Sequence, residues 1–321
     1  MIKRIAQSIL FSILATASAS ATAVDSARDM LAAGRIDEVI VTLNGHLSSS
    51  PSDAESANLL CRAYLAIEEL NHAESSCKKA IALDPDNSRY HRWMGHVYGA
   101  KADKANFLSA AGLAGKTRQE LERAVQLNPN DIEARCDLAE FYFEAPGIVG
   151  GGQDKARAQA RIFATSAPER EHWIYAHLAE KNGDPVTAER EYRHMIEASN
   201  GDSEAWLSLA LFYRHQKRYD DMEQTLIRTG QAPTSKPDVL VDAAQNLYRT
   251  NRNTPLAIEF LRRYFSSGPV EEAPAFKAHY LLGMLLERQG DKVAAAREYR
   301  SSLSLARQFG SAQQALNRVS H

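Results

Sequence analysis

The sequence predicts an all-α protein, a right-handed superhelical solenoid of antiparallel helix pairs. Prolines that close apolar segments recur at a spacing near 34 residues: Pro85 follows Pro51 by 34, and Pro129 follows Pro85 by 34 plus an insertion of 10. Small residues recur in register between these prolines, and no segment alternates polar and apolar side chains as a strand does. A period near 34 residues is typical of stacked helix-turn-helix units.

Composition and charge agree with a folded protein and exclude one class of partner. The 321 residues are 44% hydrophobic and 24% charged, which is ample for a core. A formal net charge of −2 gives no reason to expect nucleic acid, because domains that bind it are usually basic.

The first segment, residues 1–23, has the features of a secretory signal peptide. Lys3 and Arg4 precede a short apolar run over residues 5–17, and Ala21-Thr22-Ala23 forms a small-x-small cleavage pattern. The run is shorter than the roughly 20 residues that span a bilayer, although an uncleaved anchor is the alternative. We therefore expect a periplasmic or secreted protein without stable membrane insertion after cleavage.

Residues 24–321 are expected to form one solenoid of about seven full repeats. In the clearest repeat, residues 54–87, small residues Cys61, Ala73 and Ala80 let two antiparallel helices approach closely, and Pro85 ends the second helix. The later repeats begin at Ser88, Ile132, Glu169, Ser203, Asp238 and Phe276. Residues 33–51 are expected to form a degenerate half repeat before them, and residues 311–321 a capping helix after them, since solenoid ends need atypical caps.

This pattern resembles the tetratricopeptide repeat (TPR) family over roughly residues 27–308. Residues 99–116, followed by residues 145–156, are similar to segments of uncharacterised exported bacterial TPR proteins. The resemblance implies an elongated superhelix whose concave groove binds a protein or peptide, and no enzyme activity.

The histidines, glycines and serines give no clear sign of chemistry. His91 and His96, like His172 and His177, lie five residues apart, which suits shared metal coordination poorly, and HExxH is absent. We therefore expect no metal site and no cofactor. The glycine-rich segment 146–152 is interpreted as a lengthened inter-helix turn, with an anion-binding loop as the alternative. No serine, histidine and acid constellation can be assembled.

Two of the three cysteines fall on facing helices of one repeat. Cys61 and Cys77 are either a disulfide, which an oxidising compartment would allow, or ordinary small core residues. The sequence leaves this open, and Cys136 would be unpaired.

The TPR resemblance implies which side chains line the groove. Those expected to contact a partner are Arg62, Arg89, Arg92, His96, Glu140, Arg170, Trp173, His177 and Tyr280. Arginine and large aromatic residues dominate interface energetics, which suits a protein or peptide ligand. Solvated helix faces without a ligand are the plain alternative. A second hypothesis is an accessory ligand-binding protein of a polysaccharide or secretion system, with Trp173 and Tyr280 stacking on sugar.

Overall fold

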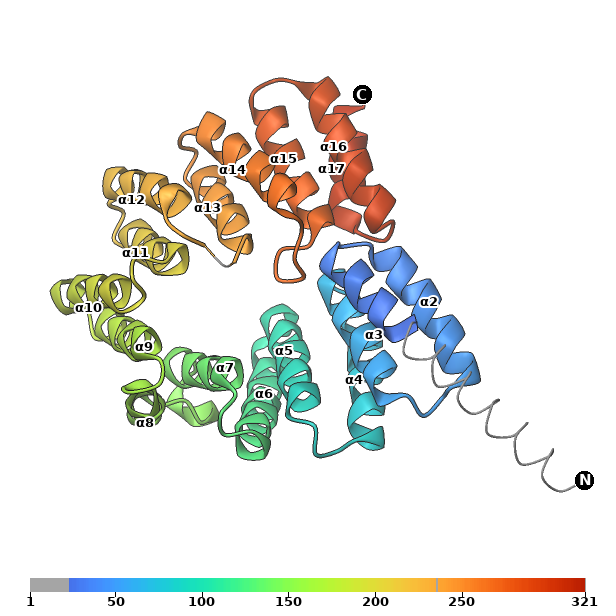
Figure 1. Ribbon diagram of the computed structural model, residues 1–321, viewed down its shortest axis with the longest axis horizontal. Helices are drawn as coiled ribbons and strands as arrows, with labels where there is room; N and C mark the ends of the chain where they lie inside the picture. Colours follow the sequence, from blue (N-terminus) through green and yellow to red (C-terminus); the bar gives the residue numbers. More distant parts are fainter. Residues whose placement is uncertain (1–22, 235, 321) are drawn as a thin grey trace, which may run out of the picture.

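The structure, a computed structural model, describes residues 23–234 and 236–320. Apart from its last residue, the expected signal peptide lies outside the described residues. The described chain is helical almost throughout, and its helices run in antiparallel pairs (Figure 1). The predicted all-α solenoid is confirmed.

Residues 23–32 form the first described helix. The remaining helices are α2 (Ile36–Ser49), α3 (Ala54–Ala66), α4 (Leu70–Leu83), α5 (Ser88–Lys104), α6 (Phe107–Leu127), α7 (Ile132–Glu144), α8 (Gln153–Phe163), α9 (Pro168–Lys181), α10 (Pro185–Ala198), α11 (Ser203–His215), α12 (Tyr219–Gln231), α13 (Asp238–Arg249), α14 (Thr254–Ser267), α15 (Ala275–Arg288), α16 (Lys292–Leu305) and α17 (Gly310–Val319).

The N-terminal unit is a whole helix pair and not the half repeat that the sequence suggests. Val24, Ala27 and Leu31, at spacings of three and four residues, are buried on one face of the first helix, which packs with α2. This helix begins at residue 23, where the expected signal peptide ends, and its short apolar pattern was not recognised as a repeat helix in the sequence.

The pair α3–α4 shows how the repeat pattern produces local structure. The Asp53 side chain caps α3 by accepting a hydrogen bond from the Ser56 backbone N–H. Ala73 and Ala80 are fully buried between the helices. Cys61 and Cys77 form a disulfide, with Cα atoms 5.1 Å apart, which answers the question left open by the sequence.

The insertion in the second full repeat lengthens helices and adds no long loop. Helices α5 and α6 have 17 and 21 residues, and Asn106 caps α6 between them. Phe107 and Leu108 stand at the end of this long hairpin with 87% and 83% of their surface exposed.

The glycine-rich segment is the lengthened turn that the sequence predicts. It contains a short 3-10 helix, η1 (Gly147–Val149), and connects α7 to α8. Gly150 has φ +96°, and a Cβ atom on Gly151 would lie 1.8 Å from the Ala145 carbonyl oxygen. The turn therefore needs glycine at both positions for backbone geometry alone.

The two ends of the solenoid pack against each other, so the helices follow a closed ring (Figure 1). Leu31 and Ile36 share one apolar cluster with Phe276 and Phe309. Gly34, at φ +71°, approaches the start of α15 so closely that a Cβ atom would lie 2.6 Å from a backbone nitrogen.

Two ion pairs also cross this junction. The Arg62 guanidinium donates from Nε to Glu271 Oε1 at 2.7 Å, and Arg307 Nε donates to Asp37 Oδ2 at 2.9 Å. The elongated shape expected from the repeats is therefore wrong. The repeat pattern specifies packing between neighbouring helices, whereas the closure depends on the summed rotation over all units.

Candidate interaction surface

The first helices of the repeats line the inside of the ring, and the second helices lie outside (Figure 1). We call this inner side the concave face; it is formed by α3, α5, α7, α9, α11, α13 and α15. The predicted partner-binding residues come from these helices, but intramolecular contacts already engage several of them.

Arg62 takes part in ring closure. Its side chain is only 17% exposed, is held by Glu271, and lies over the Trp93 ring at 4.9 Å. By contrast, Arg89 is 56% exposed, and its contact with Glu55 is a long 3.3 Å. Of these two predicted contacts, only Arg89 has its charge presented to solvent.

Arg92 and His96 converge on one carboxylate of the next repeat. Arg92 Nε and His96 Nε2 both lie 2.6 Å from Asp137 Oδ2. Burial opposes ionisation of Asp137, but the hydrogen bonds and charges of His96 and Arg92 outweigh it and lower the pKa of Asp137. This cluster joins α5 to α7, so the first reading of both residues as free ligand contacts is incomplete.

Glu140 is an exposed acid on α7 that forms no ion pair within residues 23–234 and 236–320. The concave wall surrounds it closely enough that loss of water, followed by the charges of Asp137 and Glu144, raises its pKa. A cationic partner group would relieve this cost.

Arg170 bridges neighbouring repeats. Its guanidinium makes a bidentate pair with Glu204 at 2.7 and 3.1 Å, and Lys236 lies 3.1 Å from the same carboxylate. Burial would lower the pKa of Arg170, but the hydrogen bonds and charge of Glu204 outweigh it and raise that pKa. Arg170 is therefore a bridge between α9 and α11.

Trp173 and His177 form an aromatic cluster with Phe143. His177 stacks on Phe143 with ring centroids 4.7 Å apart, and Trp173 meets Phe143 edge-on at 5.4 Å. Burial lowers the pKa of His177, which keeps its ring neutral at pH 7. Both Trp173 and His177 remain partly exposed on the concave face.

Tyr280 lies in a different cluster near the ring junction. It contacts Phe309 at 5.3 Å and Tyr299 at 5.8 Å. The structure therefore brings Trp173 and His177 together but places Tyr280 apart from them.

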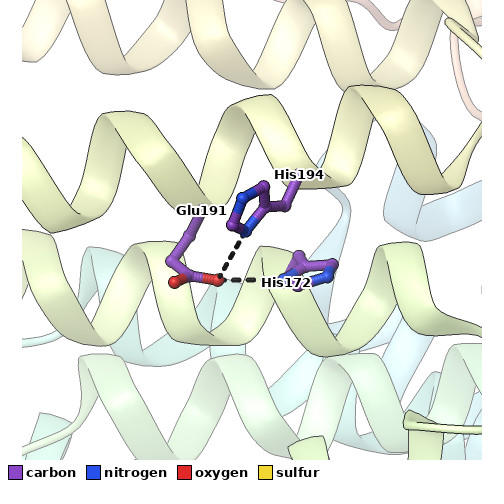
Figure 2. Close-up of side chains that lie close together, drawn as sticks. All are labelled: His172, Glu191 and His194. Atoms are coloured by element: carbon purple, nitrogen blue, oxygen red, sulfur yellow. Dashed lines mark hydrogen bonds and ion pairs between the residues drawn. The ribbon is translucent and has the colours of Figure 1, made fainter.

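Two features escaped the sequence analysis. Asp242 on α13 is an exposed side chain, yet the protein atoms around it exclude enough water that desolvation, followed by the charge of Asp238, raises its pKa to about 6. His172 on α9 meets Glu191 and His194 of α10 (Figure 2). The sequence analysis considered His172 together with His177, which lies on the same helix. The histidine that lies close to His172 in the structure is His194, 22 residues away on the facing helix.

A family model for the tetratricopeptide repeat matches residues 54–87, the repeat with the most complete pattern. The chain therefore carries a tetratricopeptide repeat at these residues. No curated protein matches the sequence significantly. Within the part that the structure describes, no helix has the length and apolar character to cross a bilayer.

Solved structures of TPR proteins are similar to this chain in fold. Yeast Tom70 superposes with a TM-score of 0.53 at 15% identity, over 89% of this chain and 58% of that chain. A thermophilic TPR protein of Thermus thermophilus, TTC0263, gives 0.49 at 20% identity over 60% and 98% of the two chains. A TPR protein from Parabacteroides merdae gives 0.47 at 14% identity over 95% and 100%. The TPR fold is a scaffold for protein–protein interactions, built from stacked helix pairs that present an extended surface.

Proposed function

We propose that this TPR protein is an exported, non-catalytic scaffold whose concave face binds a protein or extended peptide in the cell envelope. The observation that carries the proposal is the composition of α7 and α9 on that face. Exposed Glu140 lies on the same helix as Phe143, which packs with the partly exposed rings of Trp173 and His177. An aromatic anchor beside an unpaired charge is typical of protein-binding surfaces.

Export is supported by two independent features. The charged start, short apolar run and Ala21-Thr22-Ala23 pattern are typical of a cleavable leader. The Cys61–Cys77 disulfide fits an oxidising compartment such as the periplasm. Mass spectrometry of the protein from intact cells should give a chain that begins at residue 24, and a chain that retains the leader would contradict export with cleavage.

The sugar-binding alternative has less support. It needs Trp173 and Tyr280 as stacking platforms, but each ring packs in its own aromatic cluster. We therefore favour a peptide or protein ligand over a polysaccharide.

Charge reversal on the concave face tests the binding proposal. Glu140→Arg should leave folding intact, because Glu140 is exposed and unpaired among the described residues, yet it should weaken capture of the partner from an envelope extract at low ionic strength. Arg89→Glu should act similarly, since its contact with Glu55 is long and solvent-exposed.

A matched control is Glu259→Arg on the outer helix α14, whose side chain is 62% exposed. It changes the net charge equally but leaves the concave face untouched. Equal capture by the Glu140 and Glu259 variants and the parent would refute binding through this face.

A further inference from the structure

Three potential metal ligands meet on the α9–α10 pair, on a part of the molecule that the proposed function does not use (Figure 2). His172 Nδ1 lies 2.9 Å from Glu191 Oε2, and His194 Nδ1 lies 3.9 Å from the same oxygen. One candidate donor atom from each residue lies within 4.8 Å of the other two. The single oxygen Oε2 thus stands between two imidazoles.

Two other helix pairs contain the same histidine–glutamate contact, and comparing them shows which residues of the cluster serve packing and which could serve as extra metal ligands. His279 and Glu298 of the α15–α16 pair repeat the contact of His172 and Glu191, with Nδ1 and Oε2 2.7 Å apart and the same sequence separation of 19. The position equivalent to His194 there is Ser301.

The α5–α6 pair gives a third copy. His91 Nδ1 lies 2.6 Å from Glu120 Oε2, and the position equivalent to His194 is Arg123, which pairs with Asp86 at 2.8 Å. A histidine–glutamate contact between the two helices is therefore a recurring packing feature of this solenoid. His194 is the addition that distinguishes the α9–α10 copy.

His194 contributes little to the packing of α9 against α10. Its side chain is 42% exposed, and serine or arginine stands at the same position in the other copies. Its ring meets that of His172 edge-on, with centroids 5.1 Å apart. An imidazole at this place completes a set of two histidines and one carboxylate, the donors that zinc and related divalent transition metals favour.

We propose that His172, Glu191 and His194 bind one divalent transition-metal ion, with Zn²⁺ as the ion of choice. Bonds of about 2.1 Å at tetrahedral angles place donor atoms about 3.4 Å apart. To reach this spacing, the 3.9 Å separation between His194 and Glu191 must shorten and the 2.9 Å separation between His172 and Glu191 must lengthen, each by about 0.5 Å. The remaining coordination position is filled by water.

The surroundings permit this arrangement. Arg190 lies 3.5 Å from the other carboxylate oxygen, Oε1, and pairs with that oxygen rather than with Oε2. Arg157 and Asp184 line the same surface hollow as Glu191 and contribute opposite charges. A metal ion in this place would take the imidazole nitrogens and the carboxylate oxygen as donors in their deprotonated forms.

The test is calorimetric titration of tag-free protein with Zn²⁺ in a non-chelating buffer at neutral pH. We expect one saturable equivalent per chain. His194→Ser should weaken it at least 10- to 100-fold, because loss of a ligand costs no less than loss of a supporting group. His279→Asn, which breaks the equivalent pair without a third ligand, should leave Zn²⁺ binding unchanged.

A gain-of-site variant strengthens the test. Ser301→His places a third ligand beside His279 and Glu298 and should add a second equivalent of comparable affinity. Metal-free melting curves of His194→Ser should match the parent, since serine already occupies the equivalent position in α16. Absence of a saturable equivalent in the parent, or parent-like binding by His194→Ser, would overturn the proposal.

Discussion

Breaking the pair between Arg62 and Glu271 should weaken the junction that closes the ring. The two residues are 209 positions apart in sequence, and their side chains are each only 17% exposed. In an open superhelix of this length, residues in such distant repeats would not lie in contact. The pair is therefore a sensitive reporter of ring closure.

The expected magnitude follows from burial and partners. Arg62 Nε donates to Glu271 Oε1 at 2.7 Å, and Nη2 makes a second contact with Oε2. Hydrogen bonds to charged groups contribute about 1.5–3 kcal/mol, so Arg62→Ala or Glu271→Ala should each lower the free energy of unfolding by about 2 kcal/mol. Because both variants lose the same interaction, we expect a coupling energy of about 1–2 kcal/mol in a double-mutant cycle.

The cycle would be measured by urea unfolding followed by circular dichroism, with small-angle X-ray scattering of the parent as a second measurement. Arg170 and Glu204 form the control cycle, because this bidentate pair joins neighbouring repeats whether the ring is open or closed. A coupling energy below about 0.5 kcal/mol for Arg62 and Glu271, together with normal coupling for the control pair and the scattering of an extended superhelix, would refute ring closure.

Gly95→Leu should lower the free energy of unfolding by about 1–3 kcal/mol, since even a Cβ atom there lies 2.9 Å from Leu121; a parent-like urea midpoint would argue against the helix register. Replacing Cys61 and Cys77 by serine should cost about 3 kcal/mol under non-reducing conditions, from loss of a short covalent loop, and no change in melting would show that the thiols are free. Asp242 should titrate by carboxyl NMR near pH 6, and its raised pKa means that the parent loses stability as the pH rises from the ordinary carboxyl value toward that pH. Asp242→Asn should remove this loss and gain less than about 1 kcal/mol at pH 8, because water screens the side chain; an Asp242 pKa near 4 would contradict this reasoning.

Local packing could be predicted from the sequence because each repeat carries its own pattern. Cys61, Ala73 and Ala80 are fully buried in the α3–α4 pair, as the sequence predicts for the small residues at these positions. The glycine-rich turn at residues 146–152 was also interpreted correctly, since Gly150 and Gly151 report local backbone geometry.

Contacts between different units left no comparable pattern in the sequence. Arg62 and Arg92 carry the residue type and position of ligand contacts, yet their carboxylate partners, Glu271 and Asp137, come from other units. Their engagement depends on how the stack curves and on which side chains meet across repeats. Binding of a partner to the concave face also stays a prediction, because the repeat pattern in the sequence does not depend on whether a ligand binds.

The junction between the N-terminal unit and α15–α17 also changes how the chain should unfold. In a linear array the terminal repeats lack one interface, so they fray first and protection from hydrogen exchange declines toward both ends. Here the two ends pack against each other, so the terminal units have a neighbour on both sides, as the central units do. Unfolding should then begin at the weakest interface, wherever it lies, and the outermost helices should exchange their amide protons about as slowly as those in the middle.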